Sequence, residues 1–107
     1  MGQDVIVGMI TFKNASQARK IITCLLEKRL IACCNLISQV ESSFWWQGKI
    51  QKEKEVLAVI KTRQSQWARL VQEVCRMHSY QVPEILALPV LKGNPDYLKW
   101  VKETVEV

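Results

Sequence analysis

The sequence predicts a mixed α/β (α+β) fold, on three observations. Four apolar runs typical of strands alternate with two stretches whose apolar residues recur at helical spacing, in the order β-α-β-β-α-β, and one more helical stretch follows. A tight turn separates the second and third strands, which therefore form a long hairpin. The 107 residues, 49% hydrophobic and 23% charged, suit one compact domain over 1–107. This order of elements describes a ferredoxin-like sandwich with a C-terminal helix.

The first half of the chain supplies a strand, a helix and one arm of the hairpin. Residues 4–12 (DVIVGMITF) predict a strand, and Asn14 is placed to cap a helix over 15–30. The apolar residues of that helix fall on one face: Ala18, Ile21, Ile22, Leu25 and Leu26. The run over 31–46 then predicts a second strand of unusual length.

The second half begins with the other arm of the hairpin. Gly48 marks the turn, and residues 53–62 predict the third strand. Ser65 is expected to cap the second helix, and Pro83 excludes any continuation of it. The inward stripe of this helix is expected to comprise Trp67, Leu70, Val71, Val74, Cys75 and His78.

A fourth strand and a short helix complete the chain. Residues 84–91 (EILALPVL) predict the strand, and Asn94 is placed to cap a helix that has Pro95 at its first position. Four residues with helical spacing are expected to dock this helix on the assembled oligomer: Tyr97, Leu98, Trp100 and Val101.

The strands are apolar on both faces, which predicts self-association. An antiparallel sheet with one wet face should alternate apolar and polar residues. Right-handed crossovers place both main helices on one face, so the other face needs a different cover. A second copy of the same sheet is the expected cover, because most oligomers are homo-oligomers. The protruding hairpin exposes backbone edges, which also invite a neighbouring subunit.

The distribution of charge and the spacing of the cysteines argue against several classes of function. The net charge of +5 is scattered, so we expect a solvated basic surface and no nucleic-acid interface. No apolar run approaches the ~20 residues needed to span a bilayer, and the first residues do not read as a signal peptide. The four cysteines show no Cys-x-x-Cys spacing and are expected to be reduced and mostly buried. These features predict a cytoplasmic protein.

Five stretches, in this order and spacing, resemble the CutA family of divalent-cation tolerance proteins: EKRLIACCNLI, WWQGKI, EVLAVIKT, HSYQVPEILALPV and GNPDYLKWV. The patterns W-x-G-K-I and H-x-Y-x-x-P-E are specific in combination, and the resemblance covers nearly the whole chain. It implies a ferredoxin-like fold, a tightly packed homotrimer and a link to tolerance of metals such as copper. For animal members it also implies a link to the anchoring or processing of acetylcholinesterase.

The resemblance implies a place where a metal would bind. Some bacterial relatives have metal-binding residues at two histidines before the tyrosine and at a cysteine late in the first strand. The matching positions hold Met77, His78 and Met9. Two thioethers and one imidazole suit Cu(I) better than a divalent ion. We therefore expect weak copper binding at most and no required cofactor; the alternative is that both methionines fill the core.

A second kind of site is expected where subunits would meet. Besides His78, the family pattern retains four polar and aromatic residues, namely Trp46, Lys49, Tyr80 and Glu84. In a trimer, the hairpin of one subunit can reach the end of the second helix of another and form a cleft for a small anion or a peptide end. The alternative is architectural, with Trp46 packing at the interface and Lys49 solvated.

The favoured functional hypothesis is a non-enzymatic homotrimer linked to divalent metal-ion (copper) tolerance. One alternative is a protein-interaction scaffold that anchors or stabilises partner enzymes. Another is a small-anion sensor at the inter-subunit clefts. Catalysis has the least support, because Cys75 is three residues from His78 but the sequence supplies no orienting carboxylate beyond Glu84. We assign no catalytic residue.

Overall fold

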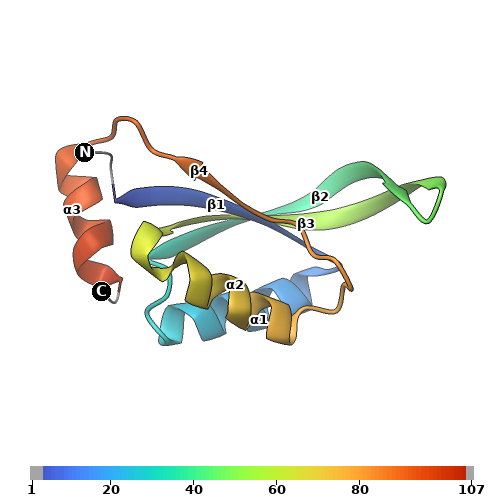
Figure 1. Cartoon of the computed structure of the whole chain (residues 1–107), viewed down its shortest axis with the longest axis horizontal. Coiled ribbons are helices and arrows are strands. Elements are labelled where there is room, and N and C mark those ends of the chain that lie inside the picture. The colour runs from blue at the N-terminus through green and yellow to red at the C-terminus, as the bar shows by residue number, and fades with distance from the viewer. Residues whose placement is uncertain (1–3, 106–107) are drawn as a thin grey trace.

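The computed structural model describes residues 4–105 and has four strands and three α-helices in that range (Figure 1). In chain order the elements are β1 (Val5–Phe12), α1 (Ala15–Glu27), β2 (Cys33–Trp46), β3 (Lys49–Arg63), the 3-10 helix η1 (Gln64–Gln66), α2 (Trp67–Met77), β4 (Ile85–Pro89) and α3 (Pro95–Thr104).

The sheet has the strand order β2-β3-β1-β4, and all neighbouring strands are antiparallel. Helices α1 and α2 contact each other and lie on the same side of the sheet (Figure 1). The β2–β3 hairpin extends well beyond them (Figure 1). This is the ferredoxin-like arrangement with a long hairpin, so the predicted fold is confirmed.

The main core lies between the sheet and the two helices. Ile10 and Phe12 of β1 are fully buried in it, together with the inward faces of α1 and α2. Gly8 points the same way, and a Cβ added there would lie 2.7 Å from Cγ1 of Ile60 and 3.2 Å from the ring of Trp67. A glycine at this position therefore lets α2 approach the sheet closely.

Helix α3 packs on the opposite face, at one end of the sheet. Successive residues of a strand point to opposite faces, so Val5 points away from the side that Gly8 faces. Val5 is buried against Leu98 of α3. Arg63, the cross-strand partner of Val5, donates from Nη1 to the carbonyl of Lys102 at 3.2 Å. The expectation that this whole face lacks a cover within the chain is therefore wrong at this end.

The C-terminal helix begins at its predicted cap. Its apolar residues face two directions, some towards the sheet and some towards solvent. The side chain of Asn94 accepts from the Asp96 N–H at 3.0 Å, and proline occupies the first turn, as predicted. Leu98 and Val101 are buried against the chain's own sheet, so they hold the helix within the single chain, and its docking on an oligomer stays a prediction. Tyr97 and Trp100 are exposed.

The first helix begins as predicted and ends earlier than expected. The side chain of Asn14 accepts from the Gln17 N–H at 2.8 Å, which confirms the cap. The helix ends at Glu27, three residues before the predicted boundary, because Arg29 has a φ of 57° and takes the left-handed conformation that closes many helices.

The second helix departs from prediction at both ends. Ser65 is not its cap, since Gln64–Gln66 form a 3-10 turn and Gln66 takes the N-cap position. Such turns are common at helix ends. The helix ends at Met77, and His78 has an extended backbone with φ −72° and ψ 142°. His78 is therefore not the last residue of the helical stripe.

All four strands differ in length from prediction: β1 and β2 begin one and two residues later than expected, and β3 and β4 differ most. β3 begins at Lys49 rather than at residue 53, directly after a two-residue turn in which Gln47 and Gly48 have φ of 51° and 77°. Positive φ at both positions is typical of the turn that matches the twist of a hairpin. β4 ends at Pro89 rather than at residue 91; this edge strand loses a ladder donor there because proline has no N–H.

The cysteines are less buried than expected. Cys24, Cys33 and Cys34 are partly buried, Cys75 is exposed, and all four thiols are free. Cys75 therefore leaves the inward stripe of α2, in contrast to the prediction. Cys33 and Cys34 do point to opposite faces: Cys34 packs against the main core, while Sγ of Cys33 lies 3.2 Å from the Tyr97 hydroxyl.

Candidate functional site at the end of the second helix

His78 is held at both ring nitrogens. Nε2 lies 2.8 Å from the backbone carbonyl oxygen of Thr11, and the backbone N–H of Tyr80 donates to Nδ1 at 3.0 Å. Since Nδ1 accepts a hydrogen bond, the ring proton sits on Nε2, which donates a hydrogen bond to the carbonyl oxygen. The imidazole is therefore neutral here, and neither nitrogen keeps a lone pair for a metal.

Two aromatic rings enclose the same imidazole. It stacks on Phe12 with ring centroids 5.2 Å apart and planes 13° apart. The Tyr80 ring lies on it at 4.8 Å and is tilted by 47°. His78 thus points inward, as the sequence predicts, although it does so from the first extended residue after α2.

The hydroxyl of Tyr80 fastens the following loop to the hairpin. It donates to Oε2 of Glu55 on β3 at 2.7 Å, and Glu55 is only 7% exposed. Burial of the phenol, together with this bond, raises the pKa of Tyr80 above its usual range. The hydroxyl therefore stays a donor at neutral pH. Sequence reasoning missed Glu55; a weak signal is that it is the last charge before the apolar run VLAVI.

The three predicted metal ligands are not brought together within one chain. Met77 packs against the core beneath the helices, on the side where His78 also lies. Met9 alternates with Gly8 and Ile10 and therefore points to the opposite face of the sheet. Among residues 4–105, no group of three His, Cys, Asp or Glu side chains is arranged to hold a metal ion.

The predicted cleft residues fall into two separate groups. Trp46 and Lys49 are cross-strand partners beside the hairpin turn, whereas Tyr80 and the exposed Glu84 belong to the loop between α2 and β4. Tyr80 contacts β3 at Glu55, and at about 3.3 Å per residue Lys49 lies roughly 20 Å further along that strand. A cleft that combines both groups needs the hairpin of a second protomer, so it stays a prediction.

The face of the sheet opposite α1 and α2 carries an apolar surface, which we call the open face. Cross-strand partners share a face, and the ladder groups Met9 with Leu86 and with Val59. The apolar members of the open face are Val7, Met9, Ile37, Leu57, Val59, Leu86 and Leu88. Ile37, Leu86 and Leu88 are 47%, 56% and 53% exposed. An exposed apolar cluster of this kind marks an interaction site.

The thiol of Cys34, which points to the main core, is not poised for nucleophilic chemistry. Burial raises the pKa of Cys34 to about 11, and the nearby Lys61 offsets only part of that rise. Burial and the bond to Cys33 raise the pKa of Tyr97 to about 12. A thiol with a raised pKa stays protonated at neutral pH and attacks poorly.

These features define a class of protein: a small ferredoxin-like domain that pairs a partly buried histidine–tyrosine–carboxylate network with an open apolar sheet face. None of the helices within residues 4–105 is long and apolar enough to cross a bilayer. The family model described as CutA1 divalent ion tolerance protein matches residues 6–104. The chain belongs to the CutA1 family.

Relatives and solved structures agree with this assignment. The chain is 44% identical to the mouse protein CutA over 95% of its length, but it spans only 58% of that protein. It is 41% identical to the divalent-cation tolerance protein CutA of Pyrococcus horikoshii, covering 92% of this chain and 96% of the archaeal one. The crystal structure of CutA1 from Oryza sativa superposes with a TM-score of 0.94 at 36% identity, covering 98% and 96% of the two chains. Of these names, that of the archaeal relative describes tolerance to divalent cations, and none of them names a reaction.

Proposed function

We propose that this protein acts in divalent-cation tolerance as a non-catalytic homotrimer, and that assembly through the open face is what the role requires. Family membership supports the link to cation tolerance. The trimer is the assembly implied by the family resemblance. The observation that carries the proposal is the open face itself.

The open face needs a cover that residues 4–105 supply only at one end. Leu86 and Leu88 project from the edge strand β4, and Ile37 projects from the other edge strand, β2. Each is about half exposed. Burying such side chains stabilises an assembly by roughly 25 cal/mol per Å² of apolar surface. Because both edges carry the same apolar character, identical copies can cover one another in a closed ring.

Tight metal binding within one protomer is not part of the proposal. Both nitrogens of His78 are engaged, and Met9 lies on the other face from Met77. A metal would have to break the bond from Tyr80 or the bond to Thr11 before it could reach the ring. Copper binding by these three residues is therefore expected to be weak.

Growth under metal stress tests the proposal. A host lacking its own family member would be grown in graded copper(II) sulfate with wild type, His78→Ala, or the double variant Leu86→Glu/Leu88→Glu. Wild type and His78→Ala are expected to restore growth. The double variant is expected to fail, because charges on the open face prevent assembly. Light scattering should report three times the 12.4 kDa chain for the first two proteins only.

A matched control and a contrary result make the assay decisive. Val82→Glu places a charge on a side chain that is 70% exposed and outside the open face, so it should restore growth. If His78→Ala stays trimeric yet loses tolerance, a metal-ligand role is favoured and the assembly proposal fails. Full tolerance by a double variant that is monomeric would also contradict the assembly proposal.

A further inference from the structure

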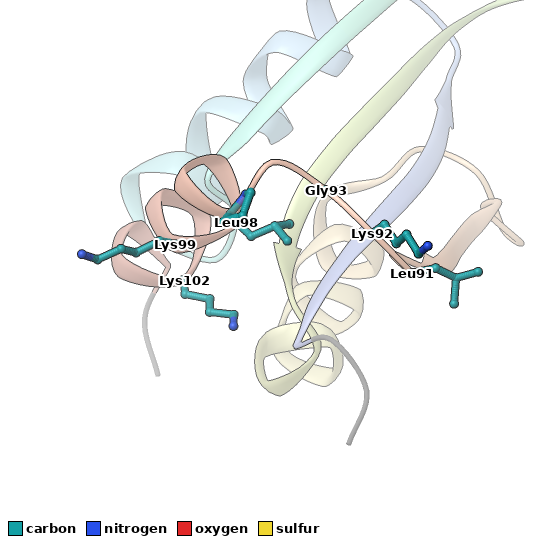
Figure 2. Close-up of a pocket in the computed structure, with 7 residues that line it drawn as sticks. Leu91, Lys92, Gly93, Leu98, Lys99 and Lys102 are labelled. Atoms are coloured by element: carbon teal, nitrogen blue, oxygen red, sulfur yellow. The ribbon is translucent and has the colours of Figure 1, made fainter.

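A basic groove lies beside α3, at the end of the molecule away from the hairpin (Figure 1). Its volume is about 530 Å³, and its walls are the segment over 91–93 and one side of α3 (Figure 2). None of the open-face residues lines it. The cation-tolerance role proposed above does not use it.

The apolar part of the groove consists of one buried leucine at its base and one exposed leucine at its edge. Leu98 is 8% exposed and forms the floor, while Leu91 is 86% exposed on the rim. Gly93 lets the rim segment pass close to the floor, because a Cβ added there would lie 3.1 Å from Cδ2 of Leu98. A leucine as exposed as Leu91, beside a preformed hollow, gives an incoming apolar side chain a surface to pack against.

The charged part of the groove is entirely positive. Lys92, Lys99 and Lys102 line it, and no acidic side chain does. None of the three takes part in an ion pair that the structure of residues 4–105 contains. The first-turn amide of α3 is already capped by the side chain of Asn94. The positive potential therefore comes from the lysines and not from the helix terminus.

We propose that this groove binds an acidic peptide segment of another protein, with carboxylates on the lysines and an apolar side chain on Leu91 and Leu98. The three lysine side chains extend in different directions in Figure 2, so they suit several separated carboxylates better than one small anion. The lining contains no aromatic side chain on which a base could stack, which disfavours a nucleic acid. Opposite charges across such a groove govern recognition and its dependence on salt.

Fluorescence anisotropy tests the proposal with a defined probe: a fluorescein-labelled decapeptide of alternating glutamate and leucine. The full chain is expected to bind it in 50 mM NaCl and to lose affinity in 300 mM NaCl. The triple variant Lys92→Gln/Lys99→Gln/Lys102→Gln is expected to bind about tenfold more weakly. The control Lys13→Gln/Lys20→Gln/Lys52→Gln removes the same charge from exposed sites elsewhere and should change affinity less than about threefold.

A second variant tests the apolar half. Leu91→Ser keeps all charges and is expected to weaken the peptide by about threefold to tenfold, since an exposed side chain loses its contact. It should leave the binding of a decaglutamate probe unchanged. Because Leu91 is so exposed, this variant keeps the test informative even if a lysine variant folds poorly.

Four outcomes would overturn the inference. One is equal weakening by the groove and control triples, which would mean unspecific attraction to a basic protein. Another is tighter binding of a labelled ten-nucleotide thymidine strand than of the peptide. A third is absence of peptide binding at low salt. The last is a smaller oligomer for the groove variants in light scattering, which would make the groove a contact between subunits.

Discussion

The backbone N–H of Tyr80 donates to Nδ1 of His78 at 3.0 Å, and the Tyr80 ring lies 4.8 Å from the imidazole that its amide holds. The loop after α2 thus locks the histidine that precedes it. Through Nε2 the same ring reaches the Thr11 carbonyl at the end of β1. One residue therefore links the end of α2, the end of β1 and the start of the loop.

This relationship predicts the tautomer and the stabilising role of His78. Nitrogen NMR of the ring should show the proton on Nε2 at neutral pH. His78→Ala should lower the free energy of unfolding by about 2–3 kcal/mol, since it removes two hydrogen bonds and the stack on Phe12. Gln81→Ala, at an exposed position nearby in the same loop, is the control and should stay within about 0.5 kcal/mol. Urea unfolding at one fixed protomer concentration measures both. A protonated Nδ1, or equal stabilities, would contradict the assignment.

The bond between Tyr80 and Glu55 predicts a loss of stability in alkali. The folded state raises the pKa of Tyr80, so the stabilisation is complete below the ordinary tyrosine pKa of about 10 and is lost as pH rises through the folded value. Unfolding curves between pH 8 and 11 should fall more steeply for wild type than for Tyr80→Phe. Tyr97→Phe removes the other phenol, and the change that it causes in the unfolding curve is subtracted as the contribution of Tyr97. Parallel curves for wild type and Tyr80→Phe would show that the Tyr80 hydroxyl does not form the bond to Glu55 in solution.

The same contacts show what the sequence could and could not predict. The order of elements, the Asn14 and Asn94 caps and the side of the sheet taken by α1 and α2 follow from local pattern and handedness, and all are confirmed. Such features depend on residues close in sequence, so they can be read without knowing distant contacts.

Most of the features that the sequence did not predict depend on contacts between residues distant in the chain. Glu55 was missed because its burial depends on Tyr80, 25 residues later. Ser65 was chosen as a cap by residue type, but a 3-10 turn displaced the helix start by one position. Met9 and Met77 were grouped by family position, while strand alternation separates them onto opposite faces. For Glu55 and Met9 the deciding fact is which side the residue faces after folding, whereas for Ser65 it is the local 3-10 turn.

A cluster at the surface of α1 and α2 predicts how the protein responds to acid. Glu73 accepts from Nη2 of Arg76 at 3.0 Å and also pairs with Lys28. The Arg76 bond, and then the Lys28 bond, lower the pKa of Glu73 to about 2. A lowered pKa gives stability above the ordinary value of about 4.3, and this is lost as pH falls towards 2. Thermal unfolding between pH 6 and 2 should show a shallower decline for Glu73→Gln, with Glu27→Gln on the same surface as control. An unchanged slope would show that the pair is not formed in solution.

The close approach of α2 to the sheet predicts the effect of one methyl group. Gly8→Ala places a Cβ 2.7 Å from Cγ1 and 2.8 Å from Cδ1 of Ile60, both of them side-chain atoms in the core. Overpacking of this kind costs about 1–3 kcal/mol. Urea unfolding should show that loss, and the loss should shrink in an Ile60→Val background, where Cδ1 is absent. Ser43→Ala adds a comparable change on an exposed strand position and should be nearly neutral. Identical losses in the two backgrounds would contradict a role for Cδ1 and would mean that the strain falls on Cγ1, which valine retains, or on the Trp67 ring, 3.2 Å away.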